Sequence, residues 1–535
     1  MLKSKYLLQA AAVAAMTVAM SAAADAGPDK TLPVAEAIRA EALRKANDPL
    51  GRPLPLVSRW VTHLSPDGNG FYPQPVFHPD RQLDLVEAGH HLLPIFPVHA
   101  NGPGYGEDTD AMRRAGAMKL PFTMLYFQPE WDLYRETKFT KLAGDKNPAT
   151  VELSGKVREQ ISPFGPVEHW RQAGQDHLPR ARMEALQKAY PEPPLVQWLS
   201  NNEPSRLFLS DAHQDVRYTR FCTDCKTLED RRRIAAEQYR IRYRAVQGGM
   251  KDVLTQAGWK ANSIFVGYDA FHWLGVFSYP GEYESVSEHQ RADWWDGASP
   301  SYYVYDWLKD YSDRGVVSPQ VGVMSWPLFV DEMLARRPDF WWEISTWDGG
   351  PGVRGRYLAA GEAYPVARYQ GFVEFGMWVA RPRVVREFQF QEPDLKVADE
   401  RFYAIMEAVD RVHENPVLRR FWRKGTLVPH PSQKHPWSFG VPEKYEKAPR
   451  WFMLDADVNP PYPWNKNVAV PVFATALVLG KAPHREWLVL AQSPLKAYSG
   501  VKLTLPEFGA LKVDTRPAVS FYRVQEAGRK VEPVK

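Results

Sequence analysis

The run Trp198-Leu-Ser-Asn-Asn-Glu-Pro-Ser205 places an amide and a carboxylate side by side directly after an apolar stretch. The apolar residues predict a buried strand that ends in Asn202 and Glu203. A second acid, Glu343, lies 140 residues further on (343 minus 203), in another short apolar run that is rich in aromatic residues. Two carboxylates at strand ends can divide catalytic work, because one can hold a proton while the other stays charged.

Each glutamate also has a plainer interpretation. Glu203 could accept from free N–H groups at the start of a helix, and Glu343 could be a salt-bridged acid at the rim of a barrel. Glu130 and Asp269 also follow predicted strands and compete for a catalytic role, and Asp348 lies just past Glu343. The alternatives remain open at the level of sequence.

Apolar runs of strand length alternate with helical patterns, which predicts a parallel β/α architecture. The predicted strands are 56–61, 91–98, 122–127, 195–199, 264–268, 301–304, 321–326, 340–344 and 372–378. Nine strands are one too many for an eight-stranded barrel. Either 56–61 lies outside the barrel, or one of 301–304 and 321–326 is a loop. The clearest helical patterns cover 34–46, 228–255, 329–336 and 398–413, and the polar stretch 138–190 predicts a loop insertion or a helical lid.

The sequence pattern changes after residue 425. A connector rich in proline and aromatic residues leads to short β-branched runs without helical periodicity, at 468–478, 486–491, 501–505, 510–513 and 519–524. These runs predict an antiparallel β-sandwich. The expected organisation is a signal peptide (1–26), a lead helix (27–50), a (β/α)8 TIM barrel of class α/β (51–425), the connector (426–450) and the sandwich (451–535).

The first residues have the pattern of an export signal. Lys3 and Lys5 precede an apolar core over 6–19, and Ala24-Asp25-Ala26 forms a cleavage site,. This predicts an exported bacterial protein of the periplasm or the extracellular space. The apolar core is short for a membrane span, and a net charge of +4 without a basic stripe argues against a nucleic-acid partner,.

Few residues suggest a metal or a redox centre. Cys222 and Cys225 are the two cysteines, and in an oxidising compartment they favour a local disulfide over a zinc or redox site,. His90 and His91 are neighbours, and adjacent side chains on a strand point to opposite faces, so both cannot bind one ion. We therefore expect no metal and no cofactor.

The Asn202-Glu203-Pro204 motif together with Glu343 resembles the clan-A group of retaining glycoside hydrolases. In that group an Asn-Glu pair closes strand four of a (β/α)8 barrel, and a nucleophilic glutamate closes strand seven. The resemblance implies that Glu203 is the acid/base, that Glu343 is the nucleophile, and that Asn202 binds the sugar 2-hydroxyl. It departs from the group in the aromatic residues that flank Glu343.

The resemblance also suggests residues that would bind a β-linked carbohydrate. Trp378, on the last strand, would form the floor of the subsite at the cleaved bond. Tyr302 or Tyr303 would form a hydrogen bond with the nucleophile. The remaining candidates are His91, Trp347 and Asp269. The neighbourhoods of Trp347-Asp-Gly and Arg381-Pro-Arg resemble barrels of enzymes that degrade algal galactans, and a sulfated galactan is one substrate that this resemblance suggests. Whether the substrate carries sulfate stays open at the level of sequence. The arginines that would pair with sulfate or carboxylate groups are Arg59, Arg206, Arg354, Arg356, Arg381 and Arg383,.

Besides a lyase acting on uronates, which would need a Tyr/His/Arg proton-transfer set that the sequence does not reveal, two other classes of function remain. One is a metal-dependent barrel hydrolase such as a deacetylase, which analysis of bound metal would reveal. The other is a catalytically silent carbohydrate-binding protein, in which both glutamates could be replaced without loss of binding.

Overall fold

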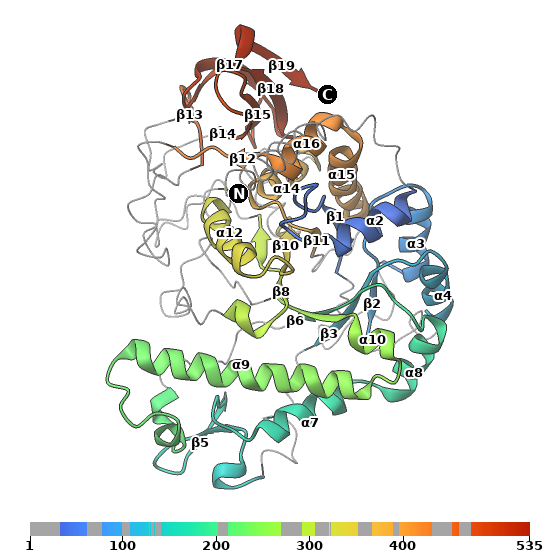
Figure 1. Cartoon of the computed structure of the whole chain (residues 1–535), viewed down its shortest axis with the longest axis vertical. Coiled ribbons are helices and arrows are strands. Elements are labelled where there is room, and N and C mark those ends of the chain that lie inside the picture. Colours follow the sequence, from blue (N-terminus) through green and yellow to red (C-terminus); the bar gives the residue numbers. More distant parts are fainter. Residues whose placement is uncertain are drawn as a thin grey trace, which may run out of the picture.

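Parallel strands form a nearly closed barrel at the centre of the computed structural model, and antiparallel sheets follow at the C-terminal end (Figure 1). The structure describes residues 33–60, 77–98, 108–127, 129, 133, 141–201, 212–268, 291–304, 320, 323–350, 366–388, 395–430, 452–459 and 472–535. The predicted signal peptide lies outside these residues.

Eight strand positions make up the barrel, in the order β1-β11-β10-β8-β7-β6-β3-β2. An isolated parallel bridge between Val57 and Leu92 brings the two ends of this sheet together. The sixth position consists of two short pieces, β8 and β9, which both pair with β10. The strands are β1 Leu56–Arg59, β2 Ile95–Pro97, β3 Phe122–Phe127, β6 Val196–Asn201, β7 Ser263–Gly267, β8 Gly297–Ala298, β9 Ser301–Tyr303, β10 Trp341–Trp347 and β11 Val384–Glu387.

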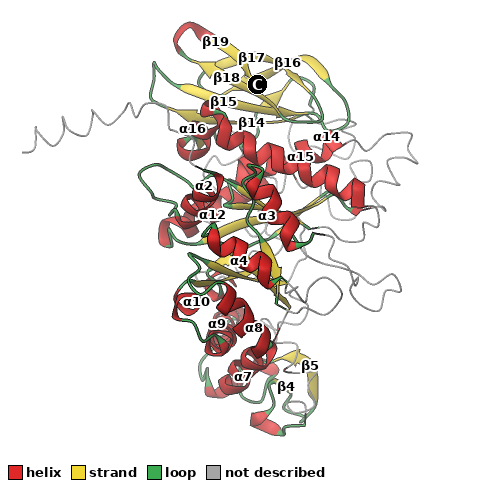
Figure 2. Cartoon of the chain, turned by 90° about the vertical axis from the view of Figure 1, so that its right-hand side faces the viewer, coloured by secondary structure: helices red, strands yellow, loops and turns green. Residues whose placement is uncertain are grey.

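Helices lie between the strands and around the barrel (Figures 1 and 2). The longest, α9, starts at a capping box in which Thr227 and Asp230 bond each other's backbone, and α16 starts at Asn415 followed by Pro416,. The helices are α2 Val34–Leu43, α3 Pro79–Glu87, α4 Thr109–Ala117, α7 Val167–His177, α8 Arg180–Ala189, α9 Leu228–Val253, α10 Ala257–Ala261, α12 Trp326–Arg336, α14 Val366–Ala380, α15 Leu395–Glu414 and α16 Pro416–Lys424.

Two of the predicted strands are wrong. Residues 372–378 lie inside helix α14, and the last barrel strand is β11, which was not predicted. A short apolar run does not distinguish a strand from a helix that is buried on all sides, and α14 is buried from Arg368 to Ala380 except for Gln370,. Residues 323–325 form a 3-10 turn that runs into α12, so the predicted strand 321–326 is the surplus one.

The C-terminal region forms two antiparallel sheets, with the orders β12-β14-β15-β18-β19 and β13-β16-β17. Val489 of one sheet and Leu503 of the other belong to one shared hydrophobic cluster. Thr426–Leu427, expected in the connector, pairs with β14 as β12. The strands are β12 Thr426–Leu427, β13 Asp455–Ala456, β14 Phe473–Leu479, β15 Glu486–Gln492, β16 Tyr498–Leu505, β17 Gly509–Thr515, β18 Ser520–Gln525 and β19 Lys530–Val534.

Helix α14 lies between the barrel and the C-terminal sheets. A Cβ atom on Gly371 would lie 1.9 Å from the backbone oxygen of Pro517, and one on Gly376 would lie 2.2 Å from the ring of Tyr302. Glycine is required at both positions because no side chain fits. The barrel and the C-terminal sheets therefore pack directly against each other through this helix.

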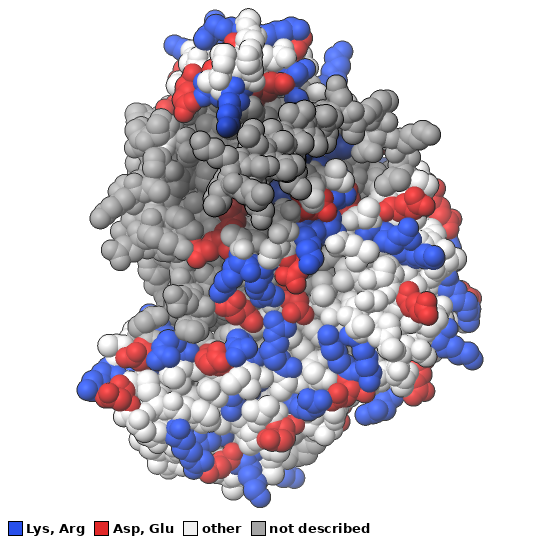
Figure 3. Space-filling view, in the orientation of Figure 1, with Lys and Arg blue, Asp and Glu red and all other residues white. Residues whose placement is uncertain are grey.

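Basic and acidic side chains are interspersed over the described surface that Figure 3 presents. This distribution shows no single-sign patch on that face. No helix in the described ranges combines the length and the apolar character that crossing a membrane requires.

Candidate active site

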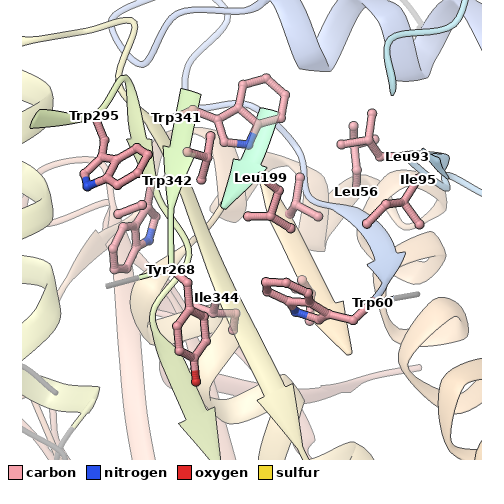
Figure 4. Close-up of a cluster of buried hydrophobic side chains, with 14 of the residues drawn as sticks. Leu56, Trp60, Leu93, Ile95, Leu199, Tyr268, Trp295, Trp341, Trp342 and Ile344 are labelled. Carbon is pink, nitrogen blue, oxygen red and sulfur yellow. The ribbon is translucent and has the colours of Figure 1, made fainter. Parts of the chain in front are cut away.

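Alternate residues of β10 point into the barrel, because successive side chains of a strand face opposite sides. Trp341, Glu343 and Ser345 make side-chain contacts with residues of other barrel strands. Trp341 lies nearest the amino-terminal end, with the Arg383 guanidinium 5.4 Å from its ring. Figure 4 shows Trp341 away from the strand tips, whereas Trp60 and Tyr268 lie closer to them.

Glu343 is the centre of a fully buried polar network. Its Oε1 accepts hydrogen bonds from Gln197 Nε2 (2.6 Å), Trp341 Nε1 (2.6 Å) and Arg386 Nη2 (2.9 Å), and its Oε2 accepts from Arg386 Nε (3.0 Å). Arg386 Nη1 donates to Ser58 Oγ (2.7 Å) on β1. Strands four, seven and eight thus meet at one carboxylate, and Arg386 connects it to Ser58 on strand one and Thr123 on strand three.

The position of Glu343 differs from the predicted one. The strand does not end at this residue but continues to Trp347, and four residues of strand span about 13 Å,. Glu343 has no solvent exposure, and its partner Gln197 stands near the beginning of β6. This geometry matches the plainer interpretation of a salt-bridged acid, although it lies inside the barrel rather than at the rim.

A layer of hydroxyl groups lies above this network. Trp60 Nε1 donates to Ser345 Oγ (3.1 Å), and Ser345 Oγ is also 3.1 Å from Ser299 Oγ. Tyr268 and Tyr303, which follow or end strands five and six, join their hydroxyl groups at 2.7 Å. In such pairs the buried hydroxyl groups satisfy each other's hydrogen-bonding capacity. The aromatic ring faces beyond them, toward the carboxyl-terminal end of the barrel, remain apolar.

Aromatic rings from three strands gather at the carboxyl-terminal end of the barrel. The rings of Tyr303 and Trp347 lie 5.4 Å apart and nearly perpendicular, and Phe388 stacks on Tyr303 at 5.8 Å with an interplanar angle of 16°. Phe388 also meets Trp60 edge-on at 5.9 Å. We call Tyr303, Trp347 and Phe388 the aromatic layer. Trp347 and Phe388 are partly exposed, so this layer is the accessible top of the packed interior.

The structure brings Tyr303 and Trp347 together as predicted site residues and adds Phe388, Trp60 and Tyr268 to them. Phe388 directly follows β11, a strand without an apolar pattern, and so its position at a strand end was hidden in the sequence. Trp60 and Tyr268 fall within or next to predicted strands. A search for aromatic residues at each strand end would have found both.

An ion-pair network lies outside the barrel wall at the ends of β1, β10 and β11. Arg59 Nε is 3.0 Å from Glu387 Oε2, and Arg59 Nη1 is 3.0 Å from Asp399 Oδ1 on α15. Arg401 Nε lies 2.8 Å from Asp348 Oδ2. Burial raises the pKa of Glu387 to about 7, although Arg59 opposes the rise. Arg59 therefore forms its ion pairs with carboxylates of the protein itself rather than with an anionic substrate group.

Two predicted substrate-binding residues face away from the barrel interior. The Tyr302 hydroxyl donates to the backbone oxygen of Phe372 (3.1 Å), and its ring stacks on Phe372 at 4.1 Å. Trp378 lies in α14 and packs against Trp422 and Phe521. Both side chains are buried between the barrel and the elements that surround it, which is a core position.

His91 lies at the opposite end of the barrel from the aromatic layer. Its Nδ1 is 2.7 Å from Asp410 Oδ1, and its ring stacks at 3.6 Å on His413, which bonds the backbone oxygen of Pro55 just before β1. Burial lowers the pKa of His413 well below its ordinary value. This position at the start of strand one does not support a role in substrate binding.

Arg381 and Arg383 were expected to meet anionic groups of a substrate, but they bond the protein backbone. Arg381 Nη1 donates to the oxygen of Gly425, and Arg383 Nη1 lies 3.4 Å from the oxygens of Glu41 and Ala42. Both are buried at the amino-terminal side of β11. They therefore join the barrel to its neighbouring helices.

Several predicted site residues lie outside the described residues: Asn202, Glu203 and Asp269, together with Glu130, Arg206, Arg354 and Arg356. The roles of these residues stay predictions. Within the described ranges, no group of three or more His, Cys, Asp or Glu side chains is arranged to hold a metal ion.

The sequence matches no family model, and it matches no curated protein. One solved structure to which the chain is similar is the agarase AgWH50C, with 15% sequence identity and a TM-score of 0.32. The similarity covers 58% of this chain and 46% of the agarase chain, so the chain aligns with less than half of that protein.

Proposed function

We propose that this protein is a glycoside hydrolase that cleaves β-linked poly- or oligosaccharides at the carboxyl-terminal end of a (β/α)8 barrel. The observation that carries the proposal is the aromatic layer of Tyr303, Trp347 and Phe388. Aromatic rings offer the apolar faces of sugars a flat surface, and polar groups beside them can bond the hydroxyl groups. Catalytic groups of parallel barrels lie at this same end.

Glu203 is the proposed general acid/base, with Asn202 beside it to bond the sugar. The support is topological, because β6 is the fourth strand of the barrel and runs to Asn201, directly before this pair. A carboxyl group at a strand end, near aromatic walls, can keep a proton for the leaving oxygen.

The retaining mechanism predicted from the sequence assigns the nucleophile to Glu343. The seventh strand position of β10 supports this role. The burial of Glu343 and its four hydrogen bonds oppose it, because a nucleophile must touch the sugar and lie about 5–5.5 Å from the acid,. The role of Glu343 therefore stays a prediction, and Glu130 and Asp269 are the next carboxylates to test.

A panel of neutral and sulfated polysaccharides, algal galactans included, tests the proposal by the release of reducing ends. We expect at least one polysaccharide to be cleaved by the wild-type protein. We expect Glu203→Ala to lose on the order of a hundred- to ten-thousand-fold in kcat, because general acid assistance typically contributes this much. Binding without cleavage of any member of the panel would instead identify a silent carbohydrate-binding protein.

An activated aryl glycoside separates the two carboxylates. Its leaving group needs no proton, so Glu203→Ala should still form a glycosyl-enzyme, and azide should then release a product of retained configuration. A product of inverted configuration would contradict the assignment. For Glu343→Ala, lost activity with an unchanged unfolding temperature would support a nucleophile, whereas lost activity with a large drop in that temperature would support a structural role.

A further inference from the structure

Two long excursions leave neighbouring strands at the carboxyl-terminal face of the barrel. The first covers the 39 residues between Phe127, at the end of β3, and Val167, at the start of α7 (166 minus 127). The second covers the 26 residues between Asn201 and Leu228, the start of α9 (227 minus 201). Segments between a strand and the helix that follows it lie on the face where barrels bind substrate. Connections longer than about 15 residues are uncommon in compact domains, and ordered ones include binding loops and active-site lids.

The described parts of these excursions, 141–165 and 212–227, form one unit that we call the rim lobe. It contains the hairpin of β4 (Ala149–Val151) and β5 (Val157–Ile161), with the 3-10 turns η3 (Ala212–Gln214) and η4 (Tyr218–Arg220). The backbone N–H of Val216 donates to the oxygen of Val151 (2.8 Å). Figures 1 and 2 both place β5 beside α7.

A buried ion pair fixes the two halves of the rim lobe to each other. Arg217 donates to both carboxylate oxygens of Asp215 (2.8 and 2.7 Å) and to the backbone oxygens of Asn147 and Ala149 (2.5 and 2.7 Å). Asp215 also accepts from Ser162 Oγ (2.7 Å). A buried ion pair adds little net stability but sets a defined geometry, so this surface unit is held in one shape.

The rim lobe carries part of the exposed apolar surface of the described chain. Of the eight large hydrophobic side chains that stand exposed there, Leu153, Val157 and Phe221 belong to the lobe, and Phe221 is the only aromatic one. Its ring stacks on buried Phe164 at 5.0 Å with an interplanar angle of 27°. The disulfide between Cys222 and Cys225 follows directly. Phe164 thus covers one face of the Phe221 ring, and the guanidinium of Arg242 lies 6.0 Å from the ring centroid. The residue remains 38% exposed, so part of the ring stays accessible on a rigid support.

We propose that the rim lobe binds saccharide units of a polymeric substrate beyond those at the cleaved bond, with Phe221 as the stacking surface. The inference rests on the proposed function, which places cleavage at the carboxyl-terminal end of the barrel. Both excursions start at that end, after β3 and β6. The lobe contains seven basic and five acidic residues, so stacking rather than net charge is its means of recognition. An extended chain that crosses the barrel mouth from the aromatic layer toward strands three and four would pass the start of both excursions.

The test compares a cleaved polysaccharide with a short aryl glycoside of the same sugar, for wild-type protein and Phe221→Ala. Loss of one aromatic contact should raise KM for the polysaccharide about two- to tenfold. It should leave kcat and KM for the aryl glycoside unchanged, because that substrate ends at the mouth. Tyr498→Ala, a partly exposed aromatic of the C-terminal sheets, is the matched control and should change neither substrate.

Direct binding of the polysaccharide, measured by affinity electrophoresis, should weaken in Phe221→Ala by a similar factor. Equal kinetic effects on both substrates, or unchanged polysaccharide binding in Phe221→Ala, would overturn the role of the lobe and leave the proposed function standing. A wild-type protein that cleaves aryl glycosides but binds no polysaccharide would do the same. A wild-type protein that neither binds nor cleaves any carbohydrate would refute the proposed function, and this inference with it.

Discussion

Two glutamate–arginine pairs lie on opposite sides of the same barrel wall, and they differ sharply. Inside, Arg386 meets Glu343 through two hydrogen bonds, and Gln197 and Trp341 supply two more. Outside, Glu387 has one contact with Arg59 at 3.0 Å, whose angle does not suit a hydrogen bond. The outer pair also shares its space with the carboxylates of Asp348 and Asp399.

The difference shows that the number of directed donors, rather than the mere presence of an arginine, determines how a buried carboxylate is stabilised. Charge-assisted hydrogen bonds on both oxygens compensate for lost water inside the barrel. Outside, burial and the two neighbouring acids outweigh Arg59 and Arg401, which lower the pKa of Glu387, and the pKa rises to about 7,. The inner pair fixes geometry, whereas the outer pair can release its charge by taking up a proton.

The largest expected effect is that of Arg386→Met. The substitution removes the cation and leaves Glu343 buried without its main partner, which costs about 3–5 kcal/mol of unfolding free energy,. Urea denaturation monitored by tryptophan fluorescence at pH 6 would measure the loss. A cost below about 1 kcal/mol would mean that the network does not hold the barrel strands together.

Arg59→Met should cost less, about 1–2 kcal/mol at pH 6. Glu387 can hold a proton at that pH, and Asp399, the other partner of Arg59, keeps its ion pair with Arg81 at 2.8 Å. No isolated charge is therefore left behind when the cation is removed. The same denaturation experiment gives the comparison directly. Equal losses for Arg386→Met and Arg59→Met would break the distinction between the inner and the outer pair.

The two pairs also explain which part of the fold could be predicted. The strand over 122–127 is confirmed residue for residue, because all its residues except Thr123 are apolar or aromatic. Strand eight has the sequence Val384-Val-Arg-Glu387, with Arg386 on the inner face and Glu387 on the outer face. Both charged residues form ion pairs, so a search for apolar runs does not find this strand. The prediction placed the last strand at 372–378 instead, because this mostly apolar run lies in helix α14, which is buried on nearly all sides.

The candidate site was predicted in part for the same reason. The predicted strands 195–199 and 340–344 are present as β6 and β10, since their apolar runs are plain in the sequence. Their numbers in the barrel, four and seven, were left open by the surplus predicted strand and come from the structure. The depth of Glu343 could not be predicted, because Ser345 and Thr346 look like the polar end of a strand. Their side chains are satisfied inside the protein by Trp60 and Tyr369, contacts that only the tertiary structure creates.

The smallest expected effect is that of Glu387→Gln at pH 5, about 1 kcal/mol or less in unfolding free energy, because the amide replaces a carboxyl group that already carries a proton,.

The informative result is how the unfolding free energy depends on pH. The folded pKa of about 7 exceeds the ordinary value of 4.5, so the folded state keeps a proton that the unfolded state releases. Its contribution to stability is complete below pH 4.5 and is lost as the pH rises through 7. The unfolding free energy of wild-type protein should therefore fall relative to that of Glu387→Gln between pH 5 and 7, which paired urea titrations at several pH values would measure. Parallel curves for the two proteins would show that Glu387 takes up no proton in this range, and would contradict the behaviour inferred for the outer pair.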